Sequence, residues 1–79
     1  MKHPFDVHVG VRLCLCRRSA GMTRQELGAR IGVDAREIRE FEKGKDRINA
    51  GLLRHVAAVT GVSPAYFFDG LAGALSDVA

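Results

Sequence analysis

The sequence contains no tryptophan, one tyrosine, two prolines and two cysteines in 79 residues. With so few aromatic side chains, the core must be built mainly from leucine, isoleucine, valine and alanine. The longest uninterrupted apolar stretches are only a few residues, which excludes a membrane-spanning helix. The N-terminal residues also lack the apolar segment of a signal peptide. We therefore expect a cytoplasmic protein.

The residues that commonly carry catalysis or bind metals are sparse and scattered. Cys14 and Cys16 are too close for a C-x-x-C pair, and on a helix they would point about 200° apart. His3, His8 and His55 do not have the spacing of metal ligands. No Ser-His-Asp arrangement and no glycine-rich phosphate loop is present. The sequence therefore predicts a protein that is not an enzyme and that has no metal or cofactor.

The cationic residues are confined to one part of the chain. All twelve lysines and arginines lie in residues 1–54, together with seven acids, whereas residues 55–79 carry two acids and no cation. A chain of this length has room for one domain but not for a deep enclosed cleft. The charge segregation is typical of a binding module with one face suited to a polyanion.

Hydrophobic periodicity predicts an all-α domain that begins with a helix over residues 7–20. Val9, Leu13, Cys16 and Ala20 recur there on one helical face. Four further short helices are predicted from N-cap residues and from the glycines that end the segments. Thr23 and Asp34 would begin the second and third helices, each with a glutamate at capping-box spacing. Asn49 and the Ser63-Pro64 pair would begin the fourth and fifth.

The second and third predicted helices are separated only by a tight turn at Gly32-Val33. Gly28 is small enough to allow the two helices to touch. This spacing indicates a helix-turn-helix, in which the second helix forms an exposed ridge. The residues expected to point inward from this unit are Leu27, Ile31, Val33, Ile38 and Phe41.

Residues 21–28 (GMTRQELG), 31–34 (IGVD), Ile38 and residues 41–44 (FEKG) resemble the Cro/C1-type (XRE-family) helix-turn-helix regulators. Residues 53–68 are similar to the family's fourth and fifth helices. The chain departs from the family at Arg24, where glutamine is common, and at residues 47–49, where a proline is common.

The resemblance implies a compact five-helix bundle of the lambda-repressor-like type. It implies sequence-specific binding of double-stranded DNA by a transcriptional regulator, expected to be a repressor and nucleoid-associated. The regulator would act as a homodimer on a palindromic operator, with residues 34–43 in the major groove. Residues 1–7 would form an N-terminal arm, residues 8–68 the DNA-binding domain and residues 69–79 a short apolar tail.

The outer face of the third helix is the candidate surface for base contacts. On a helical wheel with Ile38 directed at the core, the side chains of Arg36, Arg39, Glu40 and Lys43 lie about 100–200° away. Arginine suits guanine O6 and N7, glutamate can accept from cytosine N4, and a small side chain can contact a thymine methyl. The predicted base-reading residues are Ala35, Arg36, Arg39 and Glu40.

Other polar residues are candidates for contacts with the DNA backbone. Thr23 and Arg24 lie at the start of the second helix, where free N–H groups favour a phosphate. Lys43, Lys45 and Arg47 follow the third helix in a loop. The family resemblance further implies a structural ion pair between Arg17 and Glu42, which would tie the first helix to the third.

Contacts in a homodimer are expected from helix five and the tail, which are more apolar than the surface of a monomer requires. The residues concerned are Phe67, Phe68, Leu71 and Leu75. Three alternatives remain open. The chain could be an antitoxin that binds a protein partner, a controller protein of a restriction–modification system, or a protein-interaction module that has lost DNA binding. Arg24, Arg36, Arg39 and Lys43 argue against the last of these.

Overall fold

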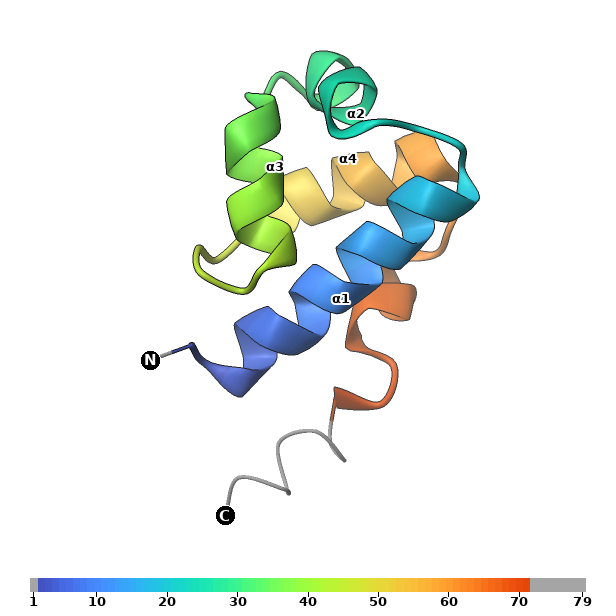
Figure 1. The fold of residues 1–79 in the computed structure, drawn as a ribbon. Helices are drawn as coiled ribbons and strands as arrows, with labels where there is room; N and C mark the ends of the chain where they lie inside the picture. The colour runs from blue at the N-terminus through green and yellow to red at the C-terminus, as the bar shows by residue number, and fades with distance from the viewer. Residues whose placement is uncertain (1, 72–79) are drawn as a thin grey trace.

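The computed structural model describes residues 2–71, which form four α-helices and a short 3₁₀ helix, with no strand in this part of the chain (Figure 1). The elements are α1 (Pro4–Ser19), α2 (Arg24–Ile31), α3 (Ala35–Glu42), α4 (Ala50–Thr60) and η1 (Pro64–Phe68). The all-α prediction is confirmed, but the expected count of five α-helices is wrong. The last element is 3₁₀, with an i→i+3 bond from Tyr66 N–H to the Ser63 carbonyl. It ends at Asp69, whose backbone is extended, and such short segments are typical of 3₁₀ geometry.

The helix starts follow local capping chemistry, with two differences from the prediction. Helix α1 begins at Pro4, before the predicted Val7, because His3 Nδ1 accepts the Phe5 N–H at 3.1 Å and proline suits the first helical turn. The capping box of α2 is confirmed, with Thr23 and Glu26 each accepting the other's backbone N–H.

The second predicted capping box is wrong. The carboxylate of Asp34 caps α3 through the Arg36 N–H at 2.7 Å. The Glu37 side chain lines a hollow with Asp46 instead of returning to the Asp34 backbone, and the neighbouring Asp46 carboxylate, which accepts a hydrogen bond only from protonated Glu37, raises the pKa of Glu37. Helix α3 is therefore capped by one side chain only.

A single core lies between the helices. Of the predicted face of α1, Val9, Leu13 and Cys16 are buried, but Ala20 is exposed because it is the C-cap of the helix. Ile48, in the loop before α4, is a core residue that helical periodicity did not reveal. The core residues are Val9, Leu13, Cys16, Leu27, Ile31, Ile38, Phe41, Ile48, Leu53, Val56, Ala57 and Phe67.

Helices α2 and α3 form the predicted helix-turn-helix, and α3 lies at one edge of the bundle (Figure 1). Gly32 ends α2 with φ of 74°, a left-handed conformation that glycine adopts without steric cost. Gly28 packs directly on the backbone carbonyl of Val33. This confirms the prediction that a small residue at position 28 allows a close approach. The tight turn and this close contact hold α3 against α2 and leave its outer face exposed.

Candidate nucleic-acid interface

The outer face of α3 is the face that the helical wheel predicted. Ile38 and Phe41 are buried, whereas Arg36, Arg39 and Lys43 are exposed. Glu40 and Ala35 are half-buried at the borders of this face. The charges on the face are mixed, because Arg36 borders the acids on one side of the helix. The acids Asp34, Glu37, Glu40 and Asp46 line one hollow together with Arg36.

The Arg17 and Glu42 side chains are in contact, which joins α1 to the end of α3. Arg17 Nε donates to Glu42 Oε2 at 2.6 Å, and the two side chains are 10% and 4% exposed. Arg17 Nη1 also donates to the Met22 carbonyl at 2.8 Å, just before α2. The hydrogen bond to Glu42 raises the pKa of Arg17 above its ordinary value. This contact fixes α1, α3 and the start of the helix-turn-helix relative to one another.

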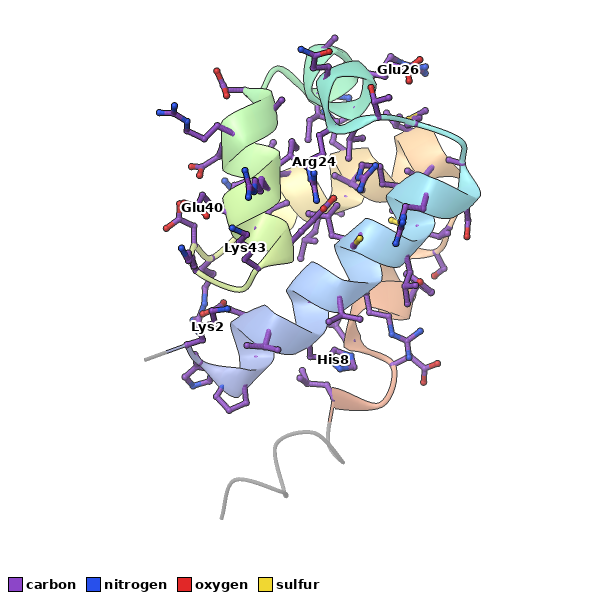
Figure 2. The ribbon with its side chains drawn as sticks, in the orientation of Figure 1. Lys2, His8, Arg24, Glu26, Glu40 and Lys43 are labelled. Carbon is purple, nitrogen blue, oxygen red and sulfur yellow. The ribbon has the colours of Figure 1, made fainter. Side chains whose placement is uncertain are left out.

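Arg24 lies on the same carboxylate, which the sequence did not indicate. Its Nε donates to Glu42 Oε1 at 2.9 Å, and its side chain remains 43% exposed. Figure 2 shows Arg24 between α3 and α1 in this view, with Lys43 and Glu40 on α3. The residue expected at a phosphate is therefore also part of an ion pair between α2 and α3.

Arg47, another candidate phosphate ligand, is paired with an acid. Its Nε donates to Asp6 Oδ1 at 2.8 Å, and its guanidinium lies 4.9 Å from the centre of the Phe5 ring. The hydrogen bond that Arg47 donates to the Asp6 carboxylate raises the pKa of Arg47. Sequence reasoning missed Asp6 and Phe5, because they lie about forty residues away and neither has a local signal of pairing. A phosphate contact by Arg47 would have to compete with Asp6.

The remaining candidate phosphate ligands differ in their availability. Lys43 and Lys45 are exposed, and neither forms an ion pair within residues 2–71. The hydroxyl oxygen of Thr23 is already engaged in the capping box as an acceptor. The structure therefore shows Thr23 as the N-cap of α2.

The structure corrects part of the predicted dimer surface. Phe67 is fully buried and is a core residue, so it is not available to a second subunit. Phe68 is 42% exposed and Leu71 is half-buried, while Leu75 lies outside the described residues. An open, mostly apolar hollow lies beside Phe68 and is lined also by Val62, Ala65 and Tyr66.

Two further findings concern the described residues only. No group of three or more histidine, cysteine or acidic side chains in residues 2–71 is arranged to hold a metal ion. No helix in that range is long and apolar enough to cross a membrane.

These features define a class of protein: a small helix-turn-helix domain with a cationic outer face on its second helix. A helix-turn-helix family model matches residues 15–67. The chain therefore belongs to this family, that of the Cro/C1-type (XRE) regulators that the sequence resembles.

Relatives and solved structures agree with this assignment. The chain is 34% identical over 71 residues to an uncharacterized HTH-type transcriptional regulator of Sinorhizobium medicae, covering 90% of this chain and 51% of the relative. It is 38% identical over 64 residues to another such regulator, from Sinorhizobium fredii, covering 81% and 45%. The chain thus spans about half the length of these curated relatives.

A similar fold is found in the crystal structure of the clp gene regulator ClgR from Corynebacterium glutamicum. The TM-score is 0.83 at 25% sequence identity, and the match covers 96% of this chain and 81% of that protein.

Proposed function

We propose that this chain binds double-stranded DNA sequence-specifically, with α3 in the major groove, and thereby represses transcription. The observation that carries the proposal is the exposed row of Arg36, Arg39 and Lys43 on α3. In the helix-turn-helix the second helix projects from the domain, so these side chains can reach base edges and phosphates without a change of fold.

The proposed contacts follow from the chemistry of the side chains. Arg36 and Arg39 would donate to guanine O6 and N7, Glu40 would accept from cytosine N4, and Ala35 would lie against a thymine methyl. The proposed ligands of the DNA backbone are Thr23, through the O–H that it can still donate, Arg24, Lys43 and Lys45, and Arg47 after exchange with Asp6.

We also propose that the protein acts as a homodimer on a palindromic operator. The half-exposed Phe68 and the adjoining apolar hollow support a contact between subunits, since isolated monomers rarely expose such groups together. A two-fold axis would place the two copies of α3 about 34 Å apart, in successive major grooves.

Selection from a pool of random duplexes, followed by sequencing of the bound fraction, tests this function. We expect an enriched inverted repeat whose half-sites are centred about 10 base pairs apart. The double variant Arg36→Ala/Arg39→Ala is expected to keep its helical content and to lose the enrichment. Binding without any enriched sequence would contradict sequence-specific recognition. A single monomeric species in sedimentation, with and without the selected DNA, would contradict the homodimer.

A further inference from the structure

One carboxylate, that of Glu42, holds guanidinium groups from two other helices. Arg17 of α1 and Arg24 of α2 both donate to it, at 2.6 Å and 2.9 Å through their Nε atoms. The carboxylate belongs to the last residue of α3 and is almost completely buried. Three helices of the DNA-binding unit therefore meet at this side chain.

The two arginines use their donors differently. Arg17 is buried, and its Nε, Nη1 and Nη2 atoms all have protein acceptors: Glu42, the Met22 carbonyl and the Cys14 sulfur. Arg24 uses only Nε, and its Nη1 and Nη2 atoms have no acceptor within residues 2–71. Because a guanidinium carries five N–H donors in a rigid plane, fixing Nε also fixes the direction of the four others. Glu42 therefore orients the unused donors of Arg24.

The position of Arg24 indicates which kind of ligand its unused donors would bind. Arg24 is the first residue of α2, where backbone N–H groups lack helical acceptors and the helix dipole is positive. Lys43, exposed and free of ion pairs in the described part of the chain, follows Glu42 directly, and Figure 2 shows it on the same side as Arg24. These groups together favour an anion with several acceptor oxygens, such as a backbone phosphate.

We propose that Glu42 is a positioning residue for DNA binding. It holds the Nε of Arg24 so that the two terminal nitrogens of Arg24 face a phosphate of the DNA backbone. This inference rests on the proposed DNA-binding function and assigns a role in it to an acid that does not itself contact DNA.

The charges at this cluster allow an acid to assist the binding of a polyanion. An isolated carboxylate beside DNA would weaken binding by repulsion. Here the two guanidinium groups outnumber the one carboxylate, so the cluster keeps one net positive charge. Arg17 neutralises Glu42, and the charge of Arg24 remains available to the phosphate.

The first test uses Arg24→Lys and Arg24→Ala, which leave the Arg17–Glu42 pair intact. Binding to one fluorescein-labelled duplex of mixed sequence is measured by anisotropy over a range of salt concentrations. Lysine keeps the positive charge but has only one nitrogen. If Glu42 binds that ammonium group, no second group remains that corresponds to the oriented Nη1 and Nη2 atoms of Arg24. We expect both variants to weaken binding roughly threefold to tenfold, and Arg24→Ala, which also removes the charge, to reduce the salt slope by about 1 per subunit. Arg24→Lys binding as tightly as the unmodified protein would overturn the proposal.

The second test removes the acid. Simple electrostatics predicts that Glu42→Gln tightens binding, and Asp46→Asn, which removes an exposed acid, controls for that effect. We expect Glu42→Gln to weaken binding severalfold when Arg24 is present and to have no weakening effect in the Arg24→Ala background. Tighter binding in both backgrounds would overturn the proposal. Glu42→Gln also weakens the ion pair with the buried Arg17 and can therefore destabilise the fold. Thermal melts by circular dichroism identify the temperatures at which all variants are folded, and binding is compared only there. If that variant does not fold, the Arg24→Lys result decides.

The outcomes separate this inference from the function on which it rests. If the unmodified protein binds no duplex at low salt, both are overturned. If it binds and Arg24→Lys is indistinguishable from it, DNA binding stands and only the positioning role of Glu42 falls.

Discussion

Gly10 of α1 lies directly against the backbone carbonyl of Phe41 near the end of α3. A Cβ atom at Gly10 would overlap the Phe41 carbonyl oxygen and would also lie 2.8 Å from the Glu42 carbonyl oxygen. Both neighbours are backbone atoms that cannot rotate away, so only a hydrogen fits at this position. The contact sets the distance between α1 and the exposed helix α3, and with it the reach of Arg17 to Glu42.

Gly10→Ala is therefore expected to destabilise the fold, although alanine is the better helix former. Overpacking against fixed backbone costs about 1–3 kcal/mol. Urea denaturation followed by circular dichroism measures the free energy of unfolding. Gly51→Ala in α4 is the matched control, because its added methyl meets only the Asn49 side-chain oxygen at 3.3 Å. Equal effects of the two substitutions would contradict the close contact.

The pH dependence of stability should differ in sign between Glu37 and Glu26. The neighbouring Asp46 carboxylate, and then burial and nearby acids, raise the pKa of Glu37, so its charged form is disfavoured in the folded state. Its contribution to stability is present below the unfolded pKa and is lost as the pH rises through the folded pKa. Glu37→Gln should therefore raise the melting temperature at pH 7, with a difference that disappears at acidic pH.

Glu26 should behave in the opposite way. The hydrogen bond from the Thr23 backbone N–H lowers the pKa of Glu26. Its contribution is present above the unfolded pKa and is lost as the pH falls through the folded pKa. Glu26→Gln is therefore expected to lower the melting temperature at pH 7 and to have no effect well below the usual glutamate range. Thermal melts of both variants across this range check the prediction, and shifts of the same sign would refute it.

Releasing Arg47 from Asp6 should strengthen the binding of DNA. Asp6→Ala removes the acceptor that holds the Arg47 guanidinium, whose side chain is already 58% exposed. If Arg47 then reaches a phosphate, anisotropy titrations should show tighter binding and a salt slope steeper by about 1 per subunit. The double variant Asp6→Ala/Arg47→Ala should lose this gain. A gain that survives without Arg47 would mean that the removed charge alone was responsible.

The neighbouring phenylalanines of η1 should respond differently to truncation. Phe67→Ala removes a fully buried ring and is expected to cost about 3–5 kcal/mol of stability. Phe68→Ala removes a half-exposed ring that stacks on Phe5, with 6.1 Å between the ring centroids. Its effect on the free energy of unfolding should therefore be much smaller. Urea denaturation measures both effects. In sedimentation, Phe68→Ala should shift a dimer towards monomer, and an unchanged dimer would exclude this ring from the interface.

Local signals in the sequence were enough to predict the existence of the four α-helices and the helix-turn-helix, although not every helix boundary. Thr23, Asp34 and Asn49 each cap the helix that follows, and the spacing of Ile38 and Phe41 identified the buried side of α3. These features depend on residues within one or two turns of each other, so the linear order of side chains contains the necessary information. The same spacing placed Arg36, Arg39 and Lys43 on the exposed side.

The last element shows the limit of such local signals. Ser63 and Pro64 correctly marked its start, but the same residues are compatible with either an α-helix or a 3₁₀ helix. In the structure Phe67 is buried in the core, and the helical conformation stops at the extended Asp69, followed by Gly70 with φ of 79°, so the segment is one short 3₁₀ helix. Periodicity also could not show which of two adjacent phenylalanines is buried.

Apart from the Arg17–Glu42 pair, which the family resemblance implied, pairing between distant charges was decided only by the tertiary structure. Arg47 pairs with Asp6, and Arg24 shares Glu42 with Arg17, although each pair is separated by at least 18 positions in the sequence. The sequence by itself determined which side chains α3 exposes, because helical geometry alone fixes their directions. Which arginines are free and which are held by an acid depends on how α1, α2 and the loop after α3 pack together. Ion pairing acts over a few ångströms in space, and separation along the chain does not measure that distance.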